Sequence, residues 1–286
     1  GLLEWENRIN PLATGIKTAW QITTVSPTYM KELATDSNGL EHLIKGELEK
    51  SVGVLNGIDD QVWDPRTDPF IKAHFKEDIA AFKQVNKEAI GNRFNVDLNL
   101  PIITFIGRLV REKGADLLPD LYRKVLYTDA KVAFVVLGTG EPVIHKAFEA
   151  LQRSFPGRFD VALEYNEGLA HQLYAGSDFL IMPSRVEPCG LNQMYAMRYG
   201  TIPLVRSIGG LKDTVIDLEE SALEGRGIRF NNFNLEESHH AVLRASQLFQ
   251  HKPVLNEIRK RVMKLDFSWN QSAENYLNIY KQLSAK

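Results

Sequence analysis

The sequence predicts an α/β protein whose main part is a doubly wound, parallel sheet. Between residues 101 and 230, short and strongly apolar segments alternate with longer amphipathic segments, which is typical of βαβ units. The segment 132–137, Val-Ala-Phe-Val-Val-Leu, has the unbroken apolar character of a strand that is covered on both faces. Each apolar segment leads into glycine, charged or aromatic residues. Because open α/β sheets bind ligands at the carboxyl ends of their strands, this edge is the predicted binding surface.

Residues 1–58 predict the last part of an upstream domain. We expect a helix over 10–20, a strand over 21–25, a helix that begins after Ser26, and a strand over 51–55. Ser26 is a favourable N-cap, and the proline that follows it suits a first helical position. So few strands cannot form a parallel sheet that is covered on both faces. The chain begins Gly-Leu-Leu-Glu, without Met or a signal sequence, so we expect a fragment of a longer protein.

Residues 59–266 predict the main domain, which begins with a proline-containing link and a solvated helix over about 71–90. The expected strands, in order, are 102–106, 132–137, 161–164, 179–182, 202–205 and 227–230. Residues 109–127 predict a loop and a helix. The further expected helices, in order, are 142–155, 169–175, 190–199, the tail from 235 onward, and a last helix at 269–283.

The composition is that of an ordinary globular protein, with 44% hydrophobic and 24% charged residues in 286. A net charge of −2 offers no basic surface for nucleic acid or an anionic membrane. The apolar runs are too short to span a bilayer. One cysteine, Cys189, rules out an internal disulfide and suits a reducing compartment, either bacterial cytoplasm or a plastid. The sequence contains no Cys and His pattern typical of a metal site.

The stretch 184–193 follows the strand 179–182 and predicts a helix start that carries Pro188 and Gly190. Free N–H groups at a helix start attract anions, and a glycine lets a ligand approach the backbone. A carboxylate next to a bound phosphate is repelled, so we interpret Glu187 as a ligand for hydroxyl groups of the molecule that carries the phosphate. A plain capped helix start is the alternative interpretation.

Arg108 and Lys113 follow the strand 102–106 and are flanked by glycines. Two fixed cations near a helix start suit a diphosphate, although surface charges on a loop are the alternative. Gly138 and Gly140 follow the next strand. A dinucleotide-binding motif would require a third glycine at the position of Val143, so we interpret Gly138 as backbone clearance beside a ligand rather than as part of an NAD site.

Tyr165, Cys189 and the histidines are further candidate site residues. Tyr165 enters a polar loop from a strand end, where its ring could stack on a base or pack at the rim. Cys189 adjoins the predicted helix start, but no histidine lies near it in sequence, so we interpret it as a packing or contact residue rather than a nucleophile. The histidines show no metal-binding spacing and are expected to be solvated or structural, including His171 on the helix after Tyr165.

These loops together resemble those of bacterial glycogen synthases and plant starch synthases, and the resemblance covers essentially the whole chain. The segments that carry it are 24–29 (Thr-Val-Ser-Pro-Thr-Tyr), 54–59 (Val-Leu-Asn-Gly-Ile-Asp), 107–114 (Gly-Arg-Leu through Lys-Gly), 187–191 (Glu-Pro-Cys-Gly-Leu), 209–215 (Gly-Gly-Leu through Asp-Thr-Val) and 266–269 (Asp-Phe-Ser-Trp).

The resemblance implies a GT-B fold, with two Rossmann-like domains and a cleft between them. Residues 1–58 would then end the N-terminal, acceptor-side domain. Residues 59–266 would be the C-terminal, nucleotide-sugar-binding domain, and 267–286 a helix that crosses back to the N-terminal domain. The implied reaction is retaining transfer of glucose from ADP-glucose to the 4-OH of an α-1,4-glucan, with no cofactor and no metal. The implied partners are ADP-glucose or ADP, the glucan, and the N-terminal domain of the same protein.

The resemblance also implies roles for individual residues. Arg108 and Lys113 would hold the diphosphate and stabilise it as it leaves. Glu187 would bind hydroxyl groups of the donor glucose, with Cys189 and Gly190 beside it. The implied nucleotide and phosphate contacts are Gly138, Tyr165 stacked on adenine, and the backbone of Gly190, Leu191 and Asn192.

Departures from the family pattern leave parts of this interpretation open. Tyr195 stands where the wider fold class has a second glutamate, and Asn192 stands where threonine is frequent. The Lys-x-Gly-Gly-Leu loop and the catalytic-region histidine of the family do not occur in this chain. We therefore expect the chain alone to be inactive. The alternatives are another GT-B transferase that uses UDP-glucose, and a nucleotide-sugar or glucan binding module without activity.

Overall fold

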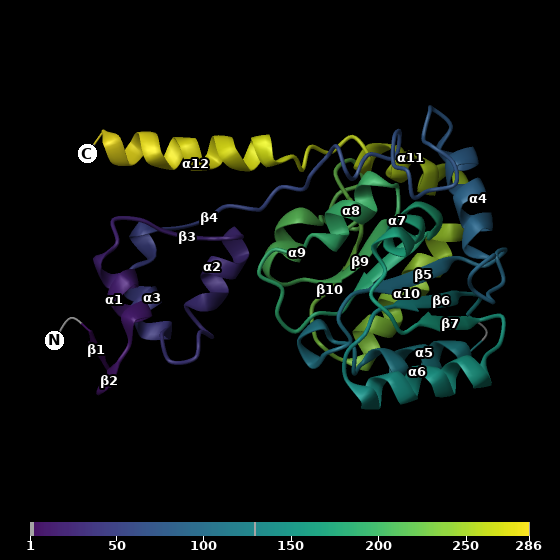
Figure 1. The fold of residues 1–286 in the computed structure, drawn as a ribbon, viewed down its shortest axis with the longest axis horizontal. Helices are drawn as coiled ribbons and strands as arrows, with labels where there is room; N and C mark the ends of the chain where they lie inside the picture. The colour runs from purple at the N-terminus through teal and green to yellow at the C-terminus, as the bar shows by residue number, and fades with distance from the viewer. Residues whose placement is uncertain (1–2, 129, 286) are drawn as a thin grey trace.

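The computed structural model describes residues 3–128 and 130–285. Figure 1 shows a small N-terminal body, a large sheet domain, and a C-terminal helix that extends away from the sheet domain and runs alongside the N-terminal body. The predicted α/β fold with a doubly wound parallel sheet is confirmed, because one six-stranded parallel sheet carries helices on both faces. The predicted boundaries at 58/59 and 266/267 stay predictions.

The sheet has the strand order β10-β9-β8-β5-β6-β7, and all of its pairings are parallel. Its strands are β5 (Ile102–Ile106), β6 (Ala133–Leu137), β7 (Phe159–Ala162), β8 (Phe179–Met182), β9 (Ile202–Arg206) and β10 (Ile228–Phe230). The chain winds outward from β5 to β7 on one side, then returns to β8 on the other side of β5. The crevice at the carboxyl ends of β5 and β8 is therefore the point where such sheets bind ligands.

Helices cover both faces of the sheet, so its strands are buried. The helices of this domain are α4 (Ile79–Ile90), α5 (Leu118–Leu126), α6 (Pro142–Ser154), α7 (Glu167–Gly176), α8 (Asn192–Arg198), α9 (Gly209–Thr214), α10 (Leu235–Gln250) and α11 (Lys252–Val262), with a 3₁₀ turn, η2, at Arg111–Lys113. Along β6, alternate residues enter two separate apolar clusters, one that includes α5, α6 and α10 and one that includes α4 and α7. The strand is thus buried between two helical layers.

The N-terminal body is much smaller. It contains the hairpin β1 (Glu4–Trp5) and β2 (Arg8–Ile9), the parallel pair β3 (Ile22–Thr24) and β4 (Ser51–Gly53), helices α1 (Pro11–Thr18), α2 (Pro27–Leu33) and α3 (Glu41–Gly46), and the turn η1 (Leu48–Lys50). Its core is limited to the buried residues Ala13, Met30, Leu40, Leu43 and Ile44. The predicted cap is confirmed, since the Ser26 hydroxyl accepts a hydrogen bond from the Tyr29 N–H at 2.9 Å.

Helix α2 and helix α9 cap one another across the junction of the two parts. The backbone N–H and the hydroxyl of Thr28 donate to the Asp213 carboxylate at 2.9 and 2.5 Å. In return, the N–H of Gly209, the first residue of α9, donates to the Glu32 carboxylate at 2.9 Å. Each carboxylate lies at the helix end where negative charge is favourable.

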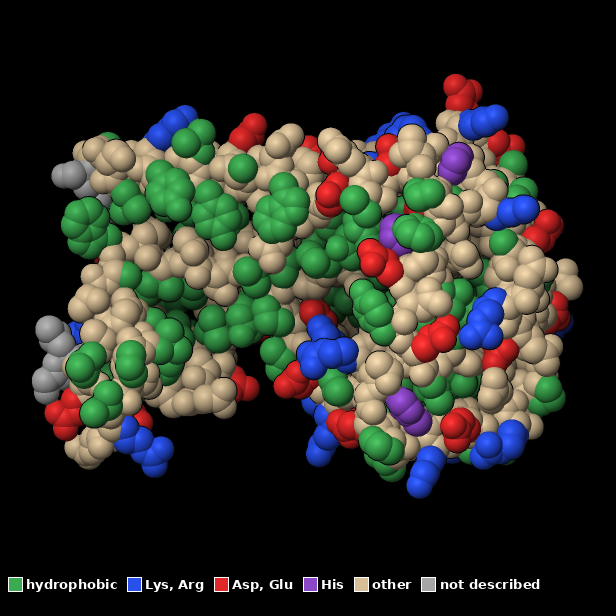
Figure 2. All heavy atoms as spheres, viewed as in Figure 1, with side chains coloured by type: hydrophobic (Ala, Val, Ile, Leu, Met, Phe, Trp, Pro, Cys, Tyr) green, Lys and Arg blue, Asp and Glu red, His purple; other side chains and the backbone are tan. Residues whose placement is uncertain are grey.

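The last helix, α12 (Trp269–Ser284), matches the predicted position closely. It is joined to the link after β4 by a hydrogen bond from the Ser272 hydroxyl to the Leu55 carbonyl, at 2.6 Å. Ser272 is its one buried residue among those described, and Leu277 and Tyr280 are exposed. Figure 2 shows hydrophobic side chains gathered along α12 and on the adjoining part of the N-terminal body.

Several predicted boundaries are wrong by a few residues. The helix expected from residue 71 begins at Ile79, because the Asp78 side chain accepts hydrogen bonds from the N–H groups of Ala80 and Ala81. Strand β7 lies at 159–162 rather than 161–164, since Phe159 pairs with Phe134 of β6.

Helix boundaries near the predicted site also differ. Helix α8 begins at Asn192 rather than at residue 190, because Gly190 has a left-handed backbone with φ of 71°. Pro188 and Gly190 therefore lie in the loop before the helix. The region 109–127, predicted as a loop followed by a helix, contains the turn η2 and then α5, whereas α9 is a helix where the sequence predicted none.

Candidate active site

Two adjoining cavities open at the carboxyl ends of β5 and β8. The outer pocket, of about 430 Å³, is lined by Trp63, Arg108, Leu137, Gly138, Thr139, Glu164, Tyr165, Asn166, Glu167, Ala170, Tyr174 and Tyr195. The inner pocket, of about 450 Å³, is lined by Val25, Asn56, Phe105, Lys113, Met182, Ser184, Glu187, Pro188, Cys189, Gly190 and Leu191. Both pockets share Ile106, Gly107 and Asn192, so they form one continuous site. Every residue proposed from the sequence for the site lines one of them.

Lys113 and Glu187, which both line the inner pocket, form an ion pair. The Lys113 ammonium donates to both carboxylate oxygens, at 2.7 and 2.8 Å. The Ser184 hydroxyl donates to Glu187 Oε2 at 2.8 Å. The Glu187 side chain is only 5% exposed and that of Lys113 is 29% exposed, so the carboxylate is largely buried while the ammonium is partly open to the pocket. The sequence placed both residues in the site but did not predict that they contact one another.

The loops that carry this pair are tied together. The Arg185 N–H donates to the Glu112 carbonyl at 2.8 Å, and the Arg185 guanidinium forms two hydrogen bonds to Asp116, at 2.5 and 2.8 Å. The hydrogen bond from Arg185 holds the pKa of the Asp116 carboxyl below its usual value. The same guanidinium lies 3.8 Å from the Phe233 ring centroid. Lys113 and Glu187 are therefore presented by two loops that form one unit.

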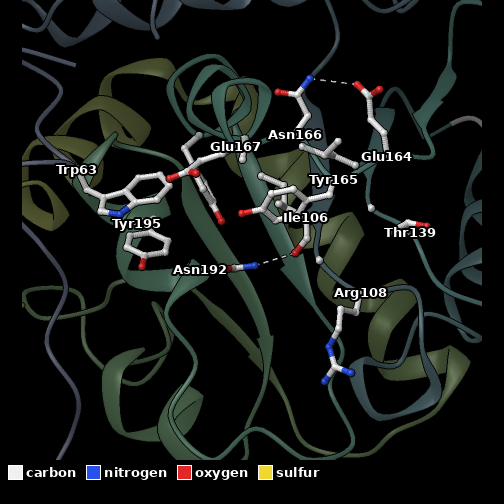
Figure 3. A pocket seen from close by; sticks show the side chains of 15 residues that line it. Trp63, Ile106, Arg108, Thr139, Glu164, Tyr165, Asn166, Glu167, Asn192 and Tyr195 are labelled. Carbon is white, nitrogen blue, oxygen red and sulfur yellow. Dashed lines mark hydrogen bonds between the residues drawn. The ribbon is translucent and has the colours of Figure 1, made fainter. Parts of the chain in front are cut away.

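Arg108 is far less constrained than Lys113. Its side chain is 68% exposed, and its ion pair with Glu112 is long, at 3.6 Å. Figure 3 shows Arg108 at one end of the outer pocket, away from Trp63 and Tyr195 at the other end. The two cations expected to act together therefore differ: the Lys113 ammonium is held by Glu187, and the Arg108 guanidinium is available to an anionic ligand.

Gly138 and Gly190 line the site for separate reasons. A Cβ on Gly138 would lie 1.9 Å from the Gly107 carbonyl oxygen, so the glycine lets the loops after β5 and β6 approach closely. Its clearance is thus needed for loop packing as well as for a ligand. Gly190 has the left-handed backbone given above, and a Cβ there would lie 2.6 Å from Gln193 Oε1. That conformation turns the chain from the Glu187 loop into α8.

The start of α8 offers backbone donors to the site. The N–H groups of Gly190, Leu191 and Asn192 form no hydrogen bond within residues 3–128 and 130–285. The Asn192 side-chain amide donates to the Ile106 carbonyl at 2.7 Å and fixes the start of α8 against the end of β5. Free N–H groups at this position suit an anion.

The outer pocket is lined by several aromatic residues, of which Tyr165 was predicted from the sequence and Trp63 was not. Tyr165 is 85% exposed and flanks the cavity. Trp63, which comes from the link before α4, stacks on both His171 and Tyr195 with ring centroids 3.8 Å apart in each case. Burial raises the pKa of the Tyr195 phenol, which keeps its proton at neutral pH. Figure 3 shows Trp63 and Tyr195 side by side, with Tyr165 nearer the opposite wall.

His171 and Cys189 have the structural environments expected of them. His171 is fully buried, and its Nδ1 lies 2.7 Å from the Asp68 carboxylate, behind Trp63. Cys189 is 5% exposed and packs against Ile58 and Met194. Burial raises the pKa of the Cys189 thiol, which disfavours the nucleophilic thiolate. Cys189 nonetheless lines the inner pocket.

Val25 and Asn56 reach the inner pocket from the N-terminal side of the chain. Neither was chosen from the sequence, although Asn56 lies in the segment 54–59 that carries the family resemblance. In the part of the chain that the structure describes, no group of three or more His, Cys, Asp or Glu side chains is placed to bind a metal ion. The helices among those residues lack the combined length and apolarity needed to cross a bilayer.

The chain matches two protein-family models. Residues 86–250 match the model "Glycosyl transferases group 1", and residues 1–46 match the model "Starch synthase catalytic domain". The first match contains both loops that form the Lys113–Glu187 pair and spans more than half of the chain.

Similar proteins agree with the family resemblance drawn from the motifs. A glycogen synthase of Flavobacterium johnsoniae is 44% identical over 282 residues, which is 98% of this chain and 59% of that protein. A structure of the starch synthase IV catalytic domain of Arabidopsis thaliana, bound to ADP and acarbose, has a TM-score of 0.88 and 34% identity over 99% of this chain and 59% of that one. Sucrose-phosphate synthase of Thermosynechococcus elongatus shares the fold, with a TM-score of 0.66 and 18% identity over 96% of this chain and 61% of that one. The chain thus spans about three fifths of the length of these relatives.

Proposed function

Since this chain belongs to the glycosyl transferases group 1 family, we propose that it forms the nucleotide-sugar half of a GT-B glucan synthase. The whole protein transfers glucose from ADP-glucose to the 4-OH of an α-1,4-glucan with retention of configuration. The glycogen synthases that the chain resembles are longer than it is. We propose that the whole protein also has an N-terminal part, which supplies the acceptor side of the cleft.

This proposal rests mainly on one observation: the inner and outer pockets adjoin one another, and charged side chains line both of them. The inner pocket contains Lys113, Glu187 and the free N–H groups at the start of α8. The outer pocket contains Arg108 and the exposed Tyr165 ring. A nucleotide sugar fits this order, with the glucose against Glu187, the diphosphate between Lys113 and Arg108, and the adenine on Tyr165. Starch synthase IV, which has the same fold, was solved with ADP and acarbose bound.

The chemistry of the reaction suits these groups. When the bond between the anomeric carbon and the phosphate oxygen breaks, negative charge grows on the diphosphate and positive charge grows on the sugar. Fixed cations and backbone N–H groups stabilise the departing diphosphate, typically by several kcal/mol. We propose that Arg108 and Lys113 supply this stabilisation without a metal ion or other cofactor. Among the described residues, Glu187 is the one carboxylate that lines the inner pocket, so that pocket does not show the carboxylate pair of glycosidases.

Calorimetric titration of the chain with ADP, UDP and ADP-glucose tests the donor assignment. We expect ADP to bind more tightly than UDP, because Tyr165 offers an open face for the larger base. Arg108→Ala should weaken ADP by about tenfold to a hundredfold, the loss expected for a charge-assisted hydrogen bond. Arg123→Ala is the matched control, because Arg123 is an exposed arginine on α5 that pairs with Asp120 outside both pockets. Equal losses in the two variants would count against the diphosphate site.

Turnover separates an enzyme from a binding module. The chain alone should transfer glucose negligibly, because the proposed acceptor side is supplied elsewhere in the protein. In the full-length protein that contains this chain, Glu187→Ala should abolish transfer while leaving ADP bound. Normal transfer by that variant would favour a binding role for Glu187 outside the reaction.

A further inference from the structure

The Glu187 carboxylate accepts hydrogen bonds from two side chains, Lys113 and Ser184. Only the contact with Lys113 competes with the proposed function, because a bound diphosphate would also attract this lysine. Lys113 donates to both oxygens at 2.7 and 2.8 Å, and Ser184 donates to Oε2 at 2.8 Å. Ser184 is 1% exposed, and no other side chain among residues 3–128 and 130–285 donates to this carboxylate. Its orientation therefore depends on one charged donor and one neutral donor.

A bound diphosphate changes the balance between these donors. An ammonium group has three N–H donors, and Lys113 donates two hydrogen bonds to Glu187. A diphosphate carries more negative charge than a carboxylate and competes for Lys113. The diphosphate also repels the Glu187 carboxylate if that carboxylate stays beside Lys113. The neutral Ser184 hydroxyl is not drawn to the phosphate in this way, and its contact with Oε2 can persist.

The backbone around Glu187 keeps this contact in register. The Glu187 carbonyl accepts a hydrogen bond from the Gly210 N–H at 3.1 Å, and the Ser184 carbonyl accepts one from the Arg206 guanidinium at 3.3 Å. Both residues are thus fixed independently of Lys113. With Oε2 occupied by the Ser184 hydroxyl, a departure of Lys113 leaves Oε1 open to a hydroxyl group of a sugar.

We propose that Ser184 is a positioning residue for donor recognition: its hydroxyl holds the Glu187 carboxylate toward the sugar when Lys113 turns to the diphosphate. The proposal rests on the function proposed above. Ser184 does not contact the donor itself and acts through Glu187. The affinity that the glucose adds to donor binding should therefore depend on the Ser184 hydroxyl. The affinity for ADP, which lacks the glucose, does not depend on that hydroxyl.

A double-mutant cycle on the chain tests this role. Calorimetry gives the dissociation constants of ADP and ADP-glucose for the unmodified chain and for Ser184→Ala, Glu187→Gln and the double variant. Ser184→Ala should leave ADP affinity within about twofold and lower the preference for ADP-glucose over ADP by about tenfold. If Ser184 acts through Glu187, the double variant should lose no more preference than Glu187→Gln alone. Because the preference is a ratio, a smaller folded fraction does not alter it.

Two further variants remove the structural explanation. Ser238→Ala is the matched control, because the Ser238 hydroxyl is also fully buried and donates to a carbonyl at 2.7 Å, at the start of α10. It should leave the preference unchanged. Ser184→Thr keeps the hydroxyl and should retain the preference within about threefold.

The outcomes that overturn the inference are distinct from failure of the proposed function. An unchanged preference in Ser184→Ala, or additive losses in the double variant, overturns the role of Ser184 while ADP binding stands. Equal losses in Ser184→Thr and Ser184→Ala overturn it as well. An unmodified chain that binds neither ADP nor ADP-glucose overturns both the inference and the function on which it rests.

Discussion

The two edges of the six-stranded sheet both carry charged side chains, and the surroundings of those charges differ. At the amino edge, the Asp178 carboxylate accepts hydrogen bonds from Lys87 at 2.7 Å, Arg259 at 2.5 Å and the Ile102 N–H at 3.0 Å. Nearby, the Lys83 ammonium donates to the Thr201 hydroxyl at 2.7 Å. All of these charged residues are at least 95% buried.

At the carboxyl edge, the charged groups are only partly satisfied by the protein. Arg108 is mostly exposed with a long ion pair, and the N–H groups at the start of α8 form no hydrogen bond within the described residues. Lys113 and Glu187 contact one another but line an open cavity. The comparison teaches that charge alone does not mark a binding site. The informative sign is a charged or polar group that faces a cavity and keeps donors or acceptors for a ligand.

The largest expected effect is a loss of stability when the charged cluster at the amino edge loses Asp178. Asp178→Ala leaves the Lys87 and Arg259 charges buried without their partner, which should lower the free energy of unfolding by about 3–5 kcal/mol. Urea unfolding followed by circular dichroism measures this loss. The ADP affinity of the folded protein should stay within about twofold, since Asp178 lies at the opposite edge from both pockets. A large change in that affinity would show that the two edges are not independent.

Acid should weaken the same edge. Burial acts to raise the pKa of Asp178, but Lys87 and Arg259 outweigh it, so this pKa lies below the usual 3.8. A carboxyl group whose pKa is lower in the folded state contributes stability above its unfolded pKa and loses it as the pH falls through the folded value. The stability difference between the wild type and Asp178→Asn should therefore be full at pH 7 and shrink below about pH 4. Urea midpoints across that range measure it, and a constant difference would contradict the argument.

A smaller effect is expected at the carboxyl edge. Tyr165→Ala should weaken ADP by about 1–3 kcal/mol, the value typical of stacking between a base and an aromatic ring. It should leave stability nearly unchanged, because the Tyr165 side chain is 85% exposed. Tyr127→Ala is the matched control, as Tyr127 is 75% exposed at the end of α5 and lines neither pocket. Calorimetry with ADP measures the loss of affinity, and a thermal melt measures stability. A loss of affinity without a loss of stability is the result expected at the carboxyl edge and the opposite of that expected for Asp178→Ala.

The comparison also explains how much could be predicted from the sequence. The strand-end loops with Arg108, Lys113, Glu187 and Tyr165 were predicted correctly as lining one site, because the alternation of apolar and helical segments fixes which loops meet at the carboxyl edge. Their roles toward a donor stay predictions. The amino-edge cluster around Asp178 was not predicted, since its members come from two helices and a strand start that show no local motif.

Other features depend on contacts between residues far apart in the chain. Lys113 and Glu187 are 74 positions apart, and residue types alone do not indicate that one neutralises the other. Trp63 and Asn56 lie in the link outside the βαβ pattern, so periodicity gave no reason to place them in the site. The predicted start of α8 was wrong because Gly190 adopts a left-handed backbone, which a glycine permits but does not require.

The smallest expected effect concerns Glu112, the exposed partner of Arg108. Both side chains are about 70% exposed, and a surface pair of this kind is worth about 0–1 kcal/mol, so Glu112→Gln should change stability by less than about 0.5 kcal/mol. The substitution removes a negative charge beside the proposed diphosphate site and releases Arg108, so ADP should bind up to about threefold more tightly. Charges exposed to solvent are screened by salt, and the gain should vanish near 1 M salt. Calorimetry at low and high salt measures this, and a gain that persists at high salt would mean that Glu112 contacts the nucleotide directly.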